Sequence, residues 1–142
     1  MKKVSRENLD ALFAAIAEAK KLYLPVADGT DEKRGVKYSV WTPEAKYAAE
    51  AVNTVRSAKD FFFPQVENLL TFKTSGKELA LEQNIPPAGV TIVMGVRACD
   101  ARSFKILDKV FLKVPVDTYY KTRREQCVLI GLGCSAPEET CF

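Results

Sequence analysis

Val90-Thr-Ile-Val-Met-Gly-Val96 decides the fold of this chain, because the stretch is apolar almost throughout. Cys127-Val-Leu-Ile-Gly-Leu-Gly133 is a second stretch of the same kind. Two helical segments lie between them: the first begins at Asp100, and the second runs from Asp117 to about Gln126. Continuous apolar strands separated by helices are typical of a parallel sheet that is covered on both faces. The predicted fold class is therefore α/β, with a partly parallel sheet covered by helices.

The N-terminal half predicts an antiparallel addition to this sheet. Two strand-like segments, Leu22 to Val26 and Val36 to Thr42, flank a charged loop and indicate a hairpin. Pro25 has no backbone N–H, which limits the first of these strands to an edge of the sheet. The next segment is alanine-rich and has a proline where a helix can begin, so we expect a helix from Pro43 to about Val55. The remaining expected elements are an N-terminal helix capped by Ser5 and a strand from Leu69 to Thr74.

Length and composition are those of one globular domain. The 142 residues are enough to bury a core without disulfides, and 47% hydrophobic with 27% charged residues is an ordinary balance. We therefore expect residues 1–142 to form a single α/β domain. No apolar run approaches the roughly 20 residues of a membrane span, and the polar start of the chain is unlike a secretory signal. The net charge of +3 is spread along the chain, which argues against a nucleic-acid partner.

The four cysteines and the absence of histidine limit the chemistry. Without histidine, catalytic triads, Cys–His nucleophiles and mixed Cys/His zinc sites are excluded. We expect the chain in the reducing cytoplasm, where thiols more often bind metals or pack than form disulfides. Cys127 begins the second apolar strand and Cys134 ends it. The seven-residue step between these two positions spans about 23 Å when extended. We therefore expect Cys127 to be a core thiol without a metal.

The other three cysteines follow apolar strands. Cys99 comes after the first strand, Cys134 ends the second, and Cys141 returns on a short loop. In an open parallel sheet, ligands bind outside the carboxyl ends of the strands, and neighbouring strands are about 4.8 Å apart. The pattern predicts a soft-metal site made by Cys99, Cys134 and Cys141, one donor short of the usual four. The alternative is that each of the three is a small buried hydrophobe.

Two charged residues flank Cys99. Asp100 is interpreted mainly as the N-cap of the helix that follows it. Arg97 has two open interpretations: a solvated charge, or a cation in contact with a cofactor, where it would offset the negative charge of a metal–thiolate group.

Five sequence blocks resemble, in their order, a known family. It is the N-terminal domain of the beta subunits of cytoplasmic hydrogenases (sulfhydrogenases) and of their relatives in anaerobic sulfite reductase, which are 4Fe-4S dicluster proteins. The resemblance is specific from about Lys59 onward and weaker before it. The blocks are Lys59-Asp-Phe-Phe-Phe-Pro-Gln65 with Glu67, Gly95-Val-Arg-Ala-Cys-Asp100, Leu107-Asp-Lys-Val-Phe111, Asp117-Thr-Tyr-Tyr120 with Arg123-Arg-Glu125, and Cys134 to Phe142.

The resemblance implies an iron–sulfur protein. Cys99, Cys134 and Cys141 then become ligands of a [4Fe-4S] cluster with Arg97 beside it, and the fourth ligand belongs to a Cys-Phe-Cys pattern that the chain leaves incomplete. The chain is then expected to be an N-terminal fragment of a longer iron–sulfur subunit whose ferredoxin-like domain is absent. The cluster itself is therefore expected to be absent from this fragment, or incomplete in it.

The resemblance also implies a role in electron transfer. Such a protein relays electrons between a flavin-bearing partner and a catalytic subunit of the hydrogenase or sulfite reductase type. It is a component of an oxidoreductase complex and has no catalytic residue of its own. The alternative function is a structural or docking module of such a complex, with a zinc or empty thiol site.

Overall fold

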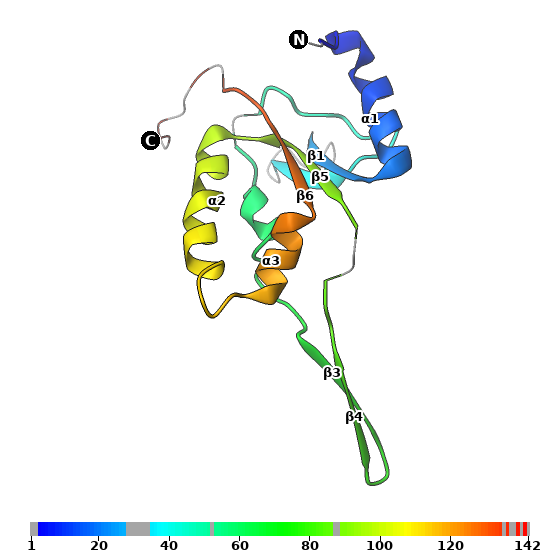
Figure 1. The fold of residues 1–142 in the computed structure, drawn as a ribbon. Helices are drawn as coiled ribbons and strands as arrows, with labels where there is room; N and C mark the ends of the chain where they lie inside the picture. The colour runs from blue at the N-terminus through cyan, green and yellow to red at the C-terminus, as the bar shows by residue number, and fades with distance from the viewer. Residues whose placement is uncertain are drawn as a thin grey trace.

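Four strands form a mixed sheet at the centre of the fold (Figure 1). They are β1 (Lys21–Ala27), β2 (Val36–Val40), β5 (Thr91–Val96) and β6 (Cys127–Gly131), in the order β2-β1-β5-β6. Strands β1, β5 and β6 are parallel to one another, whereas β2 is antiparallel to β1. The structure is a computed structural model that describes residues 3–27, 35–51, 53–86, 89–134, 136, 139 and 141. The predicted α/β fold with a partly parallel sheet and an antiparallel N-terminal addition is confirmed.

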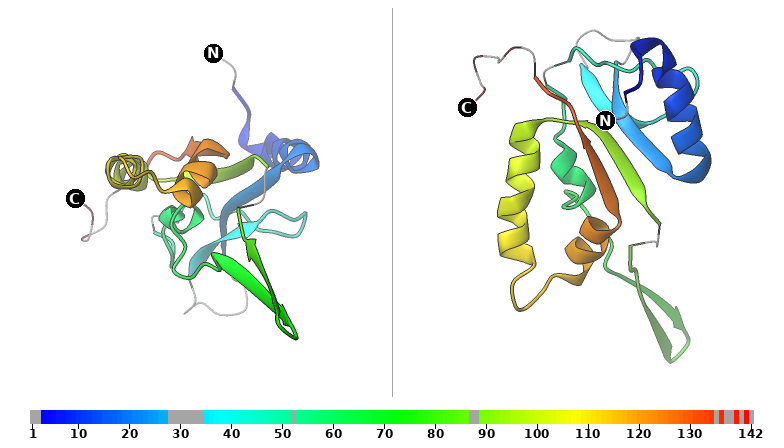
Figure 2. Two further views of the ribbon diagram at one scale, coloured as in Figure 1. Left: turned by 60° about the horizontal axis from the view of Figure 1, so that its bottom comes forward. Right: turned by 45° about the horizontal axis from the view of Figure 1, so that its top comes forward.

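Helices pack on both faces of this sheet (Figure 2). Helix α1 (Leu9–Ala19) lies on one face, where Phe13 is fully buried. Helices α2 (Ala98–Phe111) and α3 (Thr118–Glu125) and the 3₁₀ turn η3 (Ala58–Phe61) lie on the other. Alternate residues of a strand point to opposite faces, so β5 contributes Ile92 and Met94 to the first core and Val93 to the second. The buried members of the two cores are Phe13, Leu22 and Leu24 on the α1 side, and Ala58, Phe62, Val93, Val96, Phe104 and Tyr120 on the α2 side.

The prediction that Pro25 confines its strand to an edge is wrong, because β1 is an interior strand. β1 changes partners along its length: its pairing with β5 covers residues 21–23, and its pairing with β2 covers residues 23–27. Beyond Tyr23 the side toward β5 is taken by a neighbouring segment, whose Ala48 N–H donates to the Pro25 carbonyl at 2.9 Å. Pro25 therefore occupies a position where no ladder bond to β5 is needed from its nitrogen.

The predicted helix from Pro43 to Val55 is also wrong, because the described part of this range contains no helix. Tyr47 instead forms an antiparallel bridge with Val26, and the Lys46 carbonyl accepts from the Ala27 N–H at 3.4 Å. Later in the segment, the Val55 N–H donates to the Val36 carbonyl at 2.8 Å. Backbone hydrogen bonds to the first two strands outweigh the weak helix propensity of the alanines.

The structure also adjusts several predicted boundaries. Strand β3 (Leu70–Ser75) agrees with the predicted strand to within a residue at each end, but its partner β4 (Glu78–Gln83) was not predicted. Ser5 precedes a 3₁₀ turn, η1 (Arg6–Asn8), rather than α1 itself, and its side chain accepts no capping hydrogen bond. No helix in the described part of the chain is long and apolar enough to cross a membrane.

Candidate functional site

The candidate site lies at the carboxyl edge of β5 and β6. The two strands are parallel neighbours, and Val96 at the end of β5 pairs with Gly131 at the end of β6. The Leu132 N–H also donates to the Val96 carbonyl, at 2.9 Å. Arg97 and Cys99 therefore follow one strand and Cys134 follows the other at the same edge of the sheet (Figure 1). The sequence-based premise that these two strands are neighbours is confirmed.

A bulge at Gly95 shapes the end of β5. The register shifts between Met94 and Val96, and Gly95 has a φ of 84°, a conformation that side chains other than glycine rarely adopt. A Cβ at this position would lie 2.8 Å from ring atoms of Pro25. The Gly95 carbonyl accepts a hydrogen bond from the Tyr38 hydroxyl at 3.1 Å. The bulge thus fixes the direction in which the chain leaves the sheet toward Arg97.

Arg97 is the buried charged residue of this edge, with 8% of its surface exposed. Its backbone carbonyl accepts from the Ala101 N–H at 2.9 Å, and its side chain makes no capping hydrogen bond to α2. Among the described residues, no carboxylate forms an ion pair with its guanidinium. A largely buried charge that has no ion-pair partner is unfavourable. The site therefore holds a positive charge that a negatively charged group would stabilise.

Two tyrosines lie near this guanidinium. Burial, together with the smaller effect of the Asp100 carboxylate, raises the pKa of Tyr38 to about 12, and the Arg97 charge opposes both effects. Burial also raises the pKa of Tyr47, again against the effect of Arg97. The Tyr47 hydroxyl is buried without a hydrogen-bond partner in the described part of the structure. Both phenols are thus held neutral beside the arginine.

The Asp100 carboxylate joins α2 to η3. Its Oδ1 accepts from the Ser57 hydroxyl at 2.6 Å and lies 3.5 Å from Lys59 Nζ. The helix begins at Ala98, two residues before the predicted start, and Arg97 occupies the N-cap position. The interpretation of Asp100 as the N-cap is therefore wrong, because its carboxylate is engaged by the neighbouring turn.

The three predicted metal ligands are all exposed. Cys99 lies in the first turn of α2, Cys134 follows β6, and Cys141 lies near the C-terminus. In the part of the chain that the structure describes, no three Cys, Asp or Glu side chains are grouped so as to hold a metal ion. Residues 135, 137, 138 and 140, between Cys134 and Cys141, lie outside that part. The ligand set stays a prediction: the soft donors and the buried cation suit an anionic thiolate centre, and the described positions do not assemble one.

Cys127 lies at the opposite end of the sheet. It pairs with Thr91 at the start of β5, and its partly buried side chain packs against the core on the α2 side. Burial raises the pKa of its thiol to about 11. It lines a cavity of about 480 Å³ together with Tyr23 and Phe61. Cys127 thus lies at the end of the sheet opposite Cys99 and Cys134, as its place in the sequence predicts.

Sequence reasoning missed the two tyrosines of the site. Tyr38 lies on β2 and Tyr47 in the segment predicted to be helical. Tyr38 lies near Arg97 because β2 pairs with β1, and Tyr47 because its segment runs beside β1; no local pattern in the sequence signals either.

Comparison with known proteins yields a match along nearly the whole chain. Over 140 residues, or 99% of its length, the chain is 28% identical to Sulfhydrogenase 2 subunit beta of Pyrococcus furiosus. The matched part is 39% of that protein, so the chain spans about two-fifths of the length of this curated relative. No family model and no solved structure matches the chain. The similarity supports the resemblance to hydrogenase beta subunits that the sequence blocks indicate.

Proposed function

We propose that the chain belongs to an iron–sulfur electron-transfer subunit of a hydrogenase-type oxidoreductase complex. In this proposal it assists the relay of electrons between a flavin-bearing partner and a catalytic subunit in the cytoplasm. The observation that carries the proposal is the position of Cys99 and Cys134 at one sheet edge, in a chain similar over 99% of its length to Sulfhydrogenase 2 subunit beta. A hydrogenase complex is favoured over a sulfite reductase complex because of that relative's name.

Each residue of the edge has a role in this proposal. Cys99, Cys134 and Cys141 would hold a [4Fe-4S] cluster, which supplies one-electron transfer when it is bound. Arg97 would offset the negative charge of the thiolates. Among the described residues no carboxylate is ion-paired with it and would compete for its charge. The first N–H groups of α2 have no partner within the helix, so they are available to sulfur acceptors. Electrostatics and hydrogen bonds of this kind set the potential of such centres.

The test is anaerobic reconstitution with iron and sulfide of the protein expressed from its whole reading frame. Iron, sulfide and zinc are measured for the parent protein and for three single variants, Cys99→Ser, Cys134→Ser and Cys141→Ser. Cys127→Ala is the matched control, because it removes a thiol from the other end of the sheet. Thermal unfolding shows that each variant is folded.

We expect each of the three serine variants to lose iron and sulfide, and Cys127→Ala to keep the parent content. Equal iron in all four variants would refute the proposed ligand set. Stoichiometric zinc after purification, with no iron bound on reconstitution, would favour the structural or docking module instead.

A further inference from the structure

A two-stranded hairpin projects from the body of the protein (Figures 1 and 2). It consists of β3 and β4, and its tip includes Gly76, which has a φ of 61°. Residues opposite one another in an antiparallel pair share a face of the ribbon. The pairs that share the first face are Leu70 with Gln83, Phe72 with Leu81, and Thr74 with Leu79. The pairs that share the second face are Thr71 with Glu82, Lys73 with Ala80, and Ser75 with Glu78.

The hairpin is therefore amphipathic. Its apolar face, defined here as Leu70, Phe72, Leu79 and Leu81, carries no charge, and the charged side chains of the two strands lie on the opposite face. The four apolar side chains are 57%, 70%, 60% and 65% exposed, in that order. An isolated two-stranded ribbon is marginally stable in water, and a strand pair normally packs its apolar face on something. The described residues of the chain leave this face uncovered.

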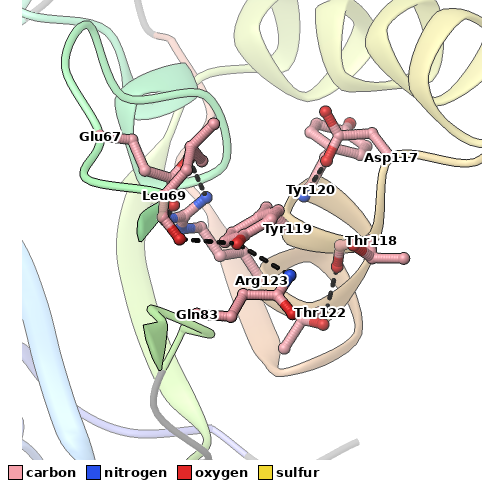
Figure 3. Close-up of polar contacts among 9 residues, drawn as sticks. All are labelled: Glu67, Leu69, Gln83, Asp117, Thr118, Tyr119, Tyr120, Thr122 and Arg123. Carbon is pink, nitrogen blue, oxygen red and sulfur yellow. Dashed lines mark hydrogen bonds and ion pairs between the residues drawn. The ribbon is translucent and has the colours of Figure 1, made fainter. Parts of the chain in front are cut away.

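The base of the hairpin is fastened to α3 (Figure 3). The Tyr119 hydroxyl donates to the Leu69 carbonyl at 3.2 Å and accepts from Gln83 Nε2 at 3.0 Å. Just before β3, Glu67 forms a two-pronged ion pair with Arg123 of α3. These contacts hold both strands where they leave the body. The direction of the ribbon is thus fixed at its base while its apolar face stays open.

We propose that the apolar face of the hairpin packs against the same face of a second copy of this chain. An uncharged aliphatic and aromatic stripe needs a partner surface of the same chemistry, and the same stripe on a second copy provides one. A two-fold contact uses the same stripe on both copies, so that each pair of residues that meet across it occurs twice, and it closes after two copies. The two ribbons would form a two-layered β-structure with the layers about 10 Å apart.

The area available agrees with such a contact. Four largely exposed Leu and Phe side chains with their neighbours offer on the order of 500 Å² per copy, or about 1,000 Å² in the pair. This total is at the lower limit of specific protein interfaces, which begin at about 1,000 Å². We therefore expect a reversible dimer that dissociates on dilution. The proposal does not depend on the proposed electron-transfer function.

The test is sedimentation equilibrium of the 142-residue chain from about 1 to 200 μM, a range in which a contact near the lower size limit dissociates. A reducing agent is present throughout, because the exposed Cys99 and Cys134 could otherwise form intermolecular disulfides. We expect the mean mass to rise toward twice that of one chain. Phe72→Ser and Leu81→Ser should each weaken the dimer at least tenfold. Ala80→Ser, on the charged face of the same strand, is the matched control and should leave it unchanged.

Both serine variants lie outside the two cores, and near-ultraviolet circular dichroism checks that they are folded. A chain that stays monomeric over the whole range would overturn the proposal, as would a dimer that survives both substitutions. A hairpin that becomes protected only when a different subunit binds would overturn the choice of a second copy as its partner.

Discussion

Arg97 is a charged residue in surroundings that are unfavourable for its charge. It is largely buried at the carboxyl edge of β5 and β6, near two neutral phenols, and no carboxylate of the described residues forms an ion pair with its guanidinium. Residues held in unfavourable surroundings are common at binding sites, where a ligand supplies the missing interaction. Arg97 is largely buried as a residue, and its contact with a cofactor stays a proposal.

Replacing Arg97 by methionine should stabilise the chain when no cluster is bound. The substitution removes a buried charge and keeps an unbranched side chain, so we expect the free energy of unfolding to rise by about 1 kcal/mol. In the reconstituted protein, the same variant should retain less iron than the parent. Urea unfolding and iron analysis measure the two effects, with Arg97→Lys as the control that keeps the charge. A loss of stability in Arg97→Met would indicate a structural role instead.

Cys127 should be the least reactive of the described thiols. Its pKa is raised to about 11 by burial, and the thiolate is the reactive form, so alkylation at pH 8 should be slow. Cys99 and Cys134 are exposed and should react first with iodoacetamide. Mass spectrometry of peptides after timed alkylation checks the order. Rapid labelling of Cys127 in the folded chain would contradict its placement at the packed start of β6.

At the scale of elements, the sequence predicts well where local pattern and tertiary structure agree. β5 and β6 are expected from their continuous apolar runs, and α2 and α3 as the helices between them, and all four are present. The prediction for the segment from Pro43 to Val55 fails because its alanines have no apolar face to bury as a helix, and the backbone bonds to β1 and β2 instead. Strand β4 was missed because its apolar part is only three residues long, between Glu78 and Glu82.

The attachment of the hairpin to α3 can be tested by removing one hydroxyl. Tyr119→Phe loses the hydrogen bonds to the Leu69 carbonyl and to Gln83, each of which contributes about 1 kcal/mol. We expect faster amide hydrogen exchange in β3 and β4 and little change in β5 and β6, measured by mass spectrometry. Thr122→Ser is the control, because it keeps the hydroxyl that donates to the Thr118 carbonyl on the same helix. Uniform acceleration in both sheets would show that Tyr119 supports the whole domain.

At the scale of the whole molecule, two cores on opposite faces of one sheet place the site. Cys99 and Cys134 follow β5 and β6 at one edge, which the sequence predicts on the premise that these two parallel strands are neighbours, and they are. The cluster around Arg97 could not be predicted in the same way. It combines β2, β5 and the segment around Tyr47, and their meeting depends on hydrogen bonds between distant parts of the chain.

The folded chain should lose stability at alkaline pH. Burial raises the pKa of Cys127 to about 11 and that of Tyr38 to about 12, and it also raises the pKa of Tyr120. Between the ordinary values, about 8.5 for a thiol and 10 for a phenol, and these raised values, the unfolded chain releases protons that the folded chain keeps. The stability that these groups contribute is then fully present below about pH 8.5, and the free energy of unfolding falls as the pH rises above this value.

Urea unfolding at about pH 8, 9.5 and 10.5, which spans the range where these groups begin to titrate, measures this decline. Tyr38→Phe removes one of the titrating groups and should reduce the slope. Cys127→Ala should also reduce the slope, mainly at the lower end of this pH range. A free energy of unfolding that is constant up to about pH 10.5 would show that these side chains are accessible to water in the folded chain.

The contact between Pro25 and Gly95 has a consequence for how this sequence can vary. The ring of Pro25 fills the space that a side chain at position 95 would need, and the backbone of Gly95 already excludes most side chains. An alanine at 95 therefore requires a smaller residue at 25 and still carries backbone strain. In a library that randomises both positions, folded members should recover the original pair or lose the Gly95 bulge. The two positions can therefore change only together. The direction in which the chain approaches Arg97 and Cys99 depends on this pair.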